Sequence, residues 1–276
     1  MLPSSKVAAQ SSLPGDGQTR LSAVVVTRDE EREVGRTIGA LSFADEVLVV
    51  DAGSTDGTVG ICRSLGAHVL QHAFEGFGPQ KRWAVSQAAH DWVLCVNAGE
   101  VVTAELAAAI RQVLAAGEPP CAAYRFRFLT VFMGRPMSHG SMSRHLQVRL
   151  FDRRRAGFTD ALVHEQVVAD GPVGELSGTV LHYPVRDLSD RVAKMDADST
   201  LGAVDLVRRG ERLGGLALVF TPAVEFLRHY LVHQNFRNGI AGLAWSFLSA
   251  VGVAMKHLKA RELEAAGDTR SRQVLP

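Results

Sequence analysis

The fold of this 276-residue chain is decided by the stretch Glu46-Val-Leu-Val-Val-Asp51-Ala-Gly-Ser-Thr-Asp56-Gly57. The apolar run predicts a buried strand that ends on Asp51, and the turn after it leads into a helix near Thr55. In an open α/β sheet, ligands bind beyond the carboxyl ends of the strands, where the N-termini of the following helices also point. We therefore expect the Asp51 carboxylate to accept hydrogen bonds from the base or ribose of a nucleotide.

Two further apolar strands end in polar clusters. Residues 21–27 lead into Arg28-Asp29-Glu30-Glu31, and residues 92–96 lead into Asn97-Ala98-Gly99-Glu100. A short strand is expected near 67–71. Expected helices cover residues 31–42, 55–65, 79–89 and 103–116. This alternation predicts a mostly parallel sheet with helices on both faces.

The second half of the chain is more mixed in character. We expect strands at 122–129, 146–151 and 173–183, and a helix at 188–209. The irregular segments between them suit acceptor binding, because loops on a rigid scaffold carry specificity.

Composition limits the partners and the compartment. Lys and Arg number 30 against 29 Asp and Glu, so no overall basic field points to nucleic acid. The 3 cysteines lack metal-site spacing and fit a reducing cytoplasm. Residues 1–20 lack the apolar core of a signal peptide and are expected to form a disordered tail, and residues 260–276 a charged tail.

The segment 211–259 is markedly apolar. Its centre, Ile240 to Met255, carries no charged residue but is shorter than the roughly 20 residues that a spanning helix needs. Basic residues such as Arg228, Arg237 and Lys256 flank it, which favours helices lying on the surface of an anionic membrane. The alternatives are a buried helix that completes the core, or a contact between two copies of the chain in a homo-oligomer.

The ordered set of motifs is similar to that of a known family. Thr27-Arg-Asp-Glu30, Val50-Asp51-Ala-Gly-Ser-Thr-Asp56 and the third polar strand end resemble the family 2 glycosyltransferases with the GT-A fold. Further matching motifs are Gly78-Pro-Gln-Lys81-Arg82-Trp83-Ala84, Arg149-Leu-Phe151, Leu162-Val-His164-Glu165, Leu181-His182-Tyr183 and Ser199-Thr-Leu-Gly202. Together they resemble the branch that adds glucose in β-1,4 linkage to the inner-core heptose of lipopolysaccharide.

This resemblance implies a fold and an activity. The expected architecture is an α/β, Rossmann-like GT-A domain with a mixed sheet over residues 21–210, followed by an apolar helical segment over 211–259. The implied enzyme is an inverting hexosyltransferase that uses UDP-glucose. Its acceptor would be lipopolysaccharide core, or another glycan or lipid-linked saccharide of the envelope, at the inner face of the cytoplasmic membrane. The alternative is a degenerate member that binds nucleotide-sugar or glycan without transfer.

The donor-binding residues are expected at the strand ends and the basic motifs. We expect Thr27, Glu30 and Asp51 around the nucleoside, and Ser54 either there or at the start of the following helix. Cationic side chains neutralise diphosphate charge. The remaining donor-site candidates are Lys81, Asn97, Glu100 and Arg149.

The third strand end departs from the family pattern at the metal site. That pattern is Asp-Ala-Asp-Glu, whereas this chain has Asn97-Ala98-Gly99-Glu100. Mg²⁺ and Mn²⁺ prefer carboxylate oxygens, so the divalent-metal site is weakened. Two alternatives follow: a metal held by Glu100, Asn97 and His182, or transfer without metal, in which Lys81, Arg149 or His182 supplies the charge.

Transfer with inversion needs a general base on the face of the sugar opposite the leaving group. Glu165 is the candidate, because a carboxylate within hydrogen-bond reach can take the proton of the acceptor hydroxyl. His164 is expected to orient the acceptor. Glu100 is an alternative base.

Overall fold

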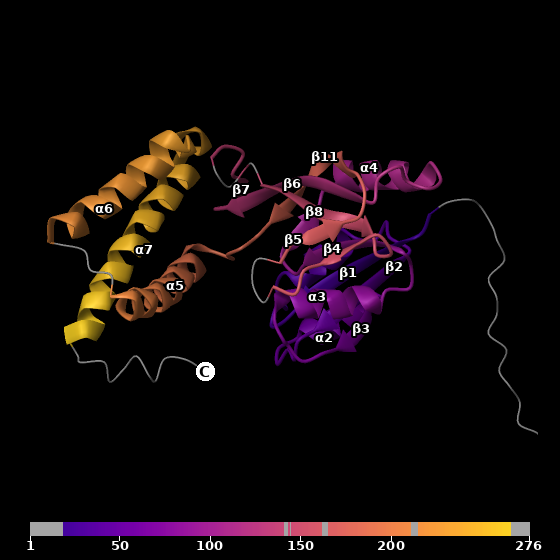
Figure 1. The fold of residues 1–276 in the computed structure, drawn as a ribbon, viewed down its shortest axis with the longest axis horizontal. Coiled ribbons are helices and arrows are strands. Elements are labelled where there is room, and N and C mark those ends of the chain that lie inside the picture. Colours follow the sequence, from indigo (N-terminus) through magenta and orange to yellow (C-terminus); the bar gives the residue numbers. More distant parts are fainter. Residues whose placement is uncertain (1–18, 141–142, 144, 162–164, 211–214, 266–276) are drawn as a thin grey trace, which may run out of the picture.

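The computed structural model describes residues 19–140, 143, 145–161, 165–210 and 215–265. It contains an α/β sheet domain and a group of helices beside it (Figure 1). Most of the two tails expected at 1–20 and 260–276 lies outside the described residues.

Four parallel strands form the first half of the sheet. They are β1 (Leu21–Thr27), β2 (Glu46–Asp51), β3 (His68–Gln71) and β4 (Trp92–Asn97). β1 pairs with β2 and with β4, and β2 pairs with β3. The middle of β1 is fully buried on both faces, which explains why its sequence is continuously apolar rather than alternating.

Four helices cover these strands. They are α1 (Val34–Gly39), α2 (Thr58–Ser64), α3 (Phe77–Ser86) and α4 (Ala104–Ala115). The core cluster on one face joins β1 to α1, α2 and α4 through Ile38, Cys62 and Ile110. The cluster on the other face joins the strands to α3 through Ala84 and Val85. The predicted helix layers on both faces are confirmed.

The second half makes the sheet mixed. Its strands are β5 (Glu100–Val102), β6 (Ala123–Phe132), β7 (Arg135–Pro136), β8 (His145–Asp152) and β11 (Val173–His182). The strand order is β3-β2-β1-β4-β8-β6-β11-β5, with β7 on β6 and β8 antiparallel to β4. A separate pair, β9 (Ala156–Phe158) and β10 (Val167–Ala169), forms a small sheet. The predicted mixed α/β fold is confirmed, whereas the shortest strands were not expected, because two or three residues show no periodicity.

Two loops at the carboxyl edge of the sheet are tied together by hydrogen bonds. The backbone N–H of Asp29 donates to Ser54 Oγ at 2.9 Å, and the N–H of Thr55 donates to Asp29 Oδ1 at 2.7 Å. The N–H of Gly57 donates to Glu31 Oε2 at 3.0 Å. The loop after β1 and the turn after β2 therefore form one unit at the place where the sequence predicts the ligand.

The helical group contains α5 (Leu188–Arg209), α6 (Gly215–Leu227), a π turn (Arg228–Val232), a 3₁₀ turn (Asn235–Asn238) and α7 (Gly239–Ala265). α5 lies against α7, where Lys259 Nζ donates to Asp196 O at 2.7 Å and to Ser199 Oγ at 2.8 Å. The helical group therefore begins at Leu188, not at the expected residue 211, and α7 continues past the expected boundary at 259.

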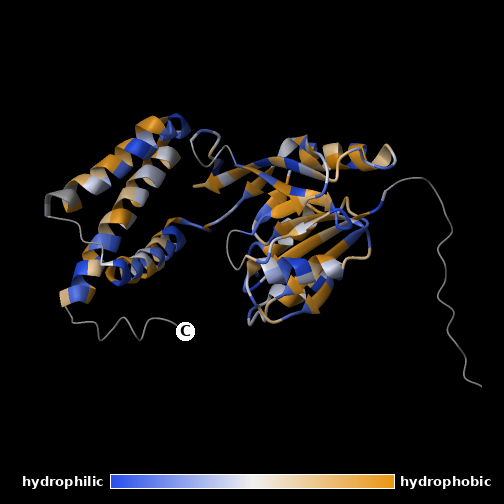
Figure 2. Cartoon of the chain, in the orientation of Figure 1, coloured by the Kyte–Doolittle hydropathy of each residue, from blue (hydrophilic) through white to orange (hydrophobic). Residues whose placement is uncertain are grey.

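A small apolar contact joins the two parts. Phe132 and Met137, from the end of β6 and beyond, pack with Val185, Ala241 and Trp245. Figure 2 shows that apolar residues concentrate in the strands of the sheet domain and are also frequent along the helices, where many of them are exposed.

Gly78, at the start of α3, has a close contact that tests this architecture. Its N–H donates to Ala161 O at 3.1 Å, and a methyl group on it would overlap the carbonyl oxygens of Thr159 and Ala161. We expect Gly78→Ala to lower the free energy of unfolding by about 1–3 kcal/mol. Urea unfolding measures this. The control, Gly60→Ala, has open space around it in α2 and should gain about 0.5–1 kcal/mol. Equal stability of the two variants would contradict the contact.

Candidate active site

Two cavities meet at the carboxyl edge of the parallel strands. The larger has a volume of about 840 Å³ and the smaller about 350 Å³. Phe77 and Asn97 line both, so the two cavities are neighbours that share one wall. A donor with a nucleoside at one end and a sugar at the other can occupy both at once.

The smaller cavity has an apolar, aromatic wall. Its lining includes Thr27, Glu30, Ala52, Phe74 and Phe77. The rings of Phe74 and Phe77 lie edge to face, with centroids 5.1 Å apart. Thr27 Oγ1 is buried and has no hydrogen-bond partner within the described part of the chain. This wall suits a planar ligand that packs its face against the aromatic rings and has polar groups along its edge.

Glu30 lies between the smaller cavity and a neighbouring cavity of about 500 Å³, which it also lines. Burial raises the pKa of the Glu30 carboxyl, and the opposing effect of nearby Lys194 is smaller. A partly desolvated carboxylate of this kind favours a hydroxyl donor such as a ribose.

Asp51 differs from the expectation. It is fully buried, and its carboxylate accepts hydrogen bonds from the N–H groups of Gly53 at 3.1 Å and Ser54 at 3.0 Å, and from Ser54 Oγ. Neither Asp51 nor Ser54 lines the two cavities. In this arrangement both side chains hold the turn after β2, and their direct contact with a nucleotide stays a prediction.

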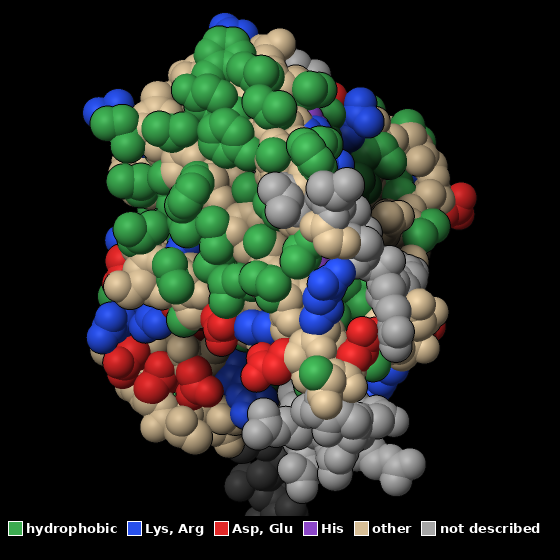
Figure 3. All heavy atoms as spheres, turned by 90° about the vertical axis from the view of Figure 1, so that its left-hand side faces the viewer, with side chains coloured by type: hydrophobic (Ala, Val, Ile, Leu, Met, Phe, Trp, Pro, Cys, Tyr) green, Lys and Arg blue, Asp and Glu red, His purple; other side chains and the backbone are tan. Residues whose placement is uncertain are grey.

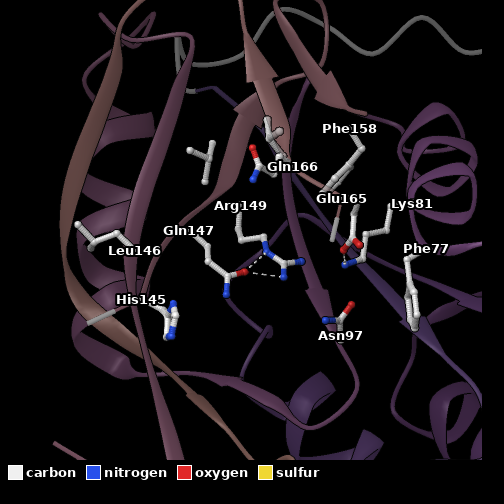
Figure 4. A pocket seen from close by; sticks show the side chains of 12 residues that line it. Phe77, Lys81, Asn97, His145, Leu146, Gln147, Arg149, Phe158, Glu165 and Gln166 are labelled. Atoms are coloured by element: carbon white, nitrogen blue, oxygen red, sulfur yellow. Dashed lines mark hydrogen bonds and ion pairs between the residues drawn. The ribbon is translucent and has the colours of Figure 1, made fainter. Parts of the chain in front are cut away.

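The larger cavity contains a buried ion pair. Lys81 Nζ lies 2.5 Å from Glu165 Oε1, and the Lys81 side chain is 1% exposed. Burial raises the pKa of the Glu165 carboxyl, but the hydrogen bond and charge of Lys81 outweigh it, so the pKa lies below its ordinary value. Glu165 is therefore ionised at neutral pH and able to accept a proton. Figure 4 shows its side chain pointing toward Lys81.

Arg149 projects from β8 into the same cavity. Its Nε and Nη2 donate to Gln147 Oε1 at 3.0 and 2.7 Å, and Nη2 lies 3.9 Å from Glu100 Oε1. Asn97 is held by the same carboxylate: its N–H donates to Glu100 Oε2 at 2.8 Å and its Nδ2 to Oε1 at 3.0 Å. Among the residues described, Arg149 Nη1 and Asn97 Oδ1 are buried without a hydrogen-bond partner.

The residues present do not fit the carboxylate metal site of the resembled family. Gly99 offers no ligand, and both oxygens of Glu100 accept hydrogen bonds from Asn97. His182 stands opposite Glu100 in the β11–β5 pair but lines the 500 Å³ cavity, and burial lowers its pKa more than Glu100 raises it. Within the described ranges, no group of three or more His, Cys, Asp or Glu is arranged to hold a metal ion.

The structure thus brings six of the expected residues to the cavity walls: Thr27, Glu30, Lys81, Asn97, Arg149 and Glu165. Glu100 lies behind Asn97, and His164 lies outside the described residues. Sequence reasoning missed Phe77 and Gln147. Gln147 is two residues from Arg149 on one strand, and this spacing places both on the same face. Phe77 is an apolar residue in a glycine-rich turn, a position where exposure is expected.

Comparison with known proteins identifies the family of the chain. Residues 22–163 match the model of glycosyl transferase family 2, so the chain belongs to this family and is a glycosyltransferase. An uncharacterised glycosyltransferase of Rickettsia typhi is 29% identical over 267 residues, covering 93% of this chain and 90% of that protein. The lipopolysaccharide core biosynthesis glycosyltransferase LpsC of Rhizobium meliloti is 28% identical over 256 residues, with 87% and 94% covered.

The similarity to solved structures is more distant. The crystal structure of S. aureus TarS superposes with a TM-score of 0.43 at 16% identity, covering 90% of this chain and 92% of that one.

The buried pair makes a prediction about stability. Lys81→Met leaves the Glu165 carboxylate without its partner and should lower the free energy of unfolding by about 3–5 kcal/mol, toward the lower end because Glu165 is 11% exposed. Urea unfolding at neutral pH measures the loss, and the double variant with Glu165→Gln should recover part of it.

The pH dependence carries a definite sign. Because Lys81 lowers the pKa of Glu165, the pair stabilises the folded chain above the ordinary pKa of a glutamate, and this stability is lost as pH falls through the lowered value. The control for the stability test of Lys81→Met is Arg82→Met, which breaks an exposed ion pair with Asp160 and should cost about 0–1 kcal/mol. A loss of stability in Arg82→Met as large as that in Lys81→Met would contradict a buried, stabilising pair.

Proposed function

We propose that this glycosyltransferase moves glucose from UDP-glucose, with inversion, to a saccharide of lipopolysaccharide core or a related envelope glycan. The observation that carries the proposal is the pair of joined cavities, one aromatic and one lined by a paired carboxylate and an arginine. The relation to LpsC, named for lipopolysaccharide core biosynthesis, supports the acceptor class.

The bonds that change are those of a single displacement. The acceptor oxygen bonds to the anomeric carbon, the bond from that carbon to the diphosphate oxygen breaks, and UDP leaves with the electron pair. The acceptor proton passes to Glu165. Lys81, paired with Glu165, holds this carboxylate in place and in its ionised form until the proton arrives.

The outer part of the larger cavity suits a saccharide acceptor. His145, Gln147 and Gln166 line it and offer several donors and acceptors to sugar hydroxyls. Leu146 and Val167 add apolar surface between these polar groups. Such a mixed wall matches a ring that has both hydroxyl edges and apolar faces.

We further propose that the helical group places the enzyme on the inner face of the cytoplasmic membrane. Over α6, the two turns and the first part of α7, the exposed large apolar residues are Phe220, Val224, Leu227, Leu231, Val232, Phe236, Ile240, Leu243 and Phe247. Figure 3 shows apolar side chains over the upper part of this face and charged side chains below. At the turns between α6 and α7, Arg237 matches anionic headgroups, whereas Arg228 is paired with Glu225 at 2.6 Å.

The segment Asn235–Ala265 is long and apolar enough to cross a membrane by length and composition: an 18-residue window within it has a mean hydropathy of 1.4, and 28% of that window is buried. We favour the surface position because α7 also packs along α5 through Lys259. The turns contact the segment that follows β7 of the sheet domain: His139 and Asn238 exchange hydrogen bonds of 3.1 and 2.9 Å. A lipid-anchored acceptor would thus meet the cavity from the membrane side.

Donor binding and transfer test the activity. UDP or UDP-glucose at about one hundred times its dissociation constant should stabilise the chain by about 2.7 kcal/mol, which thermal unfolding detects. Glu165→Gln should keep that shift and lower the transfer rate by about 10²–10⁴, measured at a temperature where both proteins are folded. Absence of a shift with any nucleotide would favour the degenerate member that does not transfer.

Vesicle sedimentation tests the membrane surface. Val232→Ser with Ile240→Ser removes two side chains that are 73% and 76% exposed, and binding to anionic vesicles should fall at least about tenfold. Leu65→Ser, at an exposed leucine of the sheet domain, is the control and should bind like the parent. A parent that ignores vesicles but forms dimers, lost in the double variant, would instead assign this face to a second copy.

A further inference from the structure

We propose that Arg149 binds the diphosphate of the donor directly, in the place where related enzymes use a divalent metal. This inference rests on the proposed function, because it concerns the same nucleotide-sugar. In this role, the Arg149 guanidinium neutralises the negative charge of the diphosphate. The third strand end, Asn97-Ala98-Gly99-Glu100, lacks the aspartates that would hold a metal ion for the same purpose.

The first support is the geometry of the guanidinium. Two of its three nitrogens, Nε and Nη2, donate to a single acceptor, Gln147 Oε1. The third, Nη1, is buried with no hydrogen-bond partner in the part of the chain that the structure describes. Figure 4 shows the group at the centre of the cavity, between Gln147 and the Lys81–Glu165 pair.

The second support is energetic. The Arg149 side chain is 9% exposed, and its nearest carboxylate oxygen, Glu100 Oε1, lies at 3.9 Å, beyond hydrogen-bond distance. A buried donor without a partner is destabilising, and more so when it is charged. An anion in the cavity removes this cost, and phosphate oxygens match the fork of a guanidinium well.

The third support is the hydrogen bonding around Asn97. With aspartate at this position, two carboxylates would face each other, and a bound cation would be needed to hold them together. Here the amide Nδ2 of Asn97 donates to Glu100 Oε1 at 3.0 Å and replaces that cation. Gly99 has φ +84°, where a side chain is strained, and an added Cβ would lie 3.3 Å from Tyr183 O. The local structure is therefore organised around hydrogen bonds rather than a metal.

The site also contains the counter-charges that this role requires. Glu100 holds Asn97 and faces Arg149, while Glu165 is paired with Lys81. The two carboxylates and the two cations balance in the free enzyme. Among the described residues, Arg149 Nη1 has no partner and is free to donate to the diphosphate, whereas the Lys81 charge is already paired with Glu165.

The experiment compares UDP with uridine, using the full chain and isothermal titration calorimetry in chelator and in Mn²⁺. Arg149→Met should weaken UDP binding at least about tenfold and leave uridine binding unchanged, because only UDP carries the diphosphate. The parent should bind UDP equally in both buffers. The control, Arg125→Met, breaks an exposed ion pair with Glu175 and should bind UDP like the parent.

Two results would overturn the proposal: UDP binding by the parent that requires Mn²⁺, or equal UDP affinity in Arg149→Met and the parent. Where Arg149→Met does not fold, Arg149→Lys keeps the charge but loses the fork, and it should still weaken UDP relative to uridine. Failure of the parent to bind either UDP or uridine would instead refute the proposed function itself, so the two failures are distinguishable.

Discussion

The active site depends on the buried ion pair between Lys81 and Glu165. The two residues are 84 positions apart, and their contact joins α3 to the segment between β9 and β10 across the larger cavity. Gly78 permits the close approach, because its N–H bonds Ala161 O with no side chain between them. The β9–β10 pairing and the Arg82–Asp160 ion pair also hold the wall that carries Glu165. The Lys81–Glu165 pair keeps a carboxylate ionised in a buried place.

The charges around the cavity come from the chain itself. Asn97, Glu100 and Arg149 form a connected set in which the amide and the guanidinium share one carboxylate. Such a set is fixed in place before any ligand arrives, which is how preorganised charge stabilises a departing group at low reorganisation cost. The chain has Asn97 and Gly99 where the family pattern has aspartates. In our proposal, the hydrogen bonds among Asn97 and Glu100 and the charge of Arg149 compensate for this difference.

The helical group carries the surface that we assign to the membrane. α5 packs along α7, and the turns between α6 and α7 carry an apolar surface and two arginines. Hydrogen bonds between His139 and Asn238 link those turns to the segment that precedes β8. Because β8 carries Gln147 and Arg149, the surface that we assign to the membrane and the wall of the cavity are parts of one connected structure.

The sequence by itself determined the alternation of strands and helices, the polar ends of β1, β2 and β4, and the apolar character of the C-terminal helices. These features follow from local periodicity, which reports whether a residue is buried. Only the tertiary structure decided that Asp51 turns inward to hold its own loop, that α5 belongs with α7, and that Glu165 is paired with Lys81. Each of these contacts depends on which residue, often far away in the sequence, comes to lie next to the group. Local periodicity carries no information about that residue.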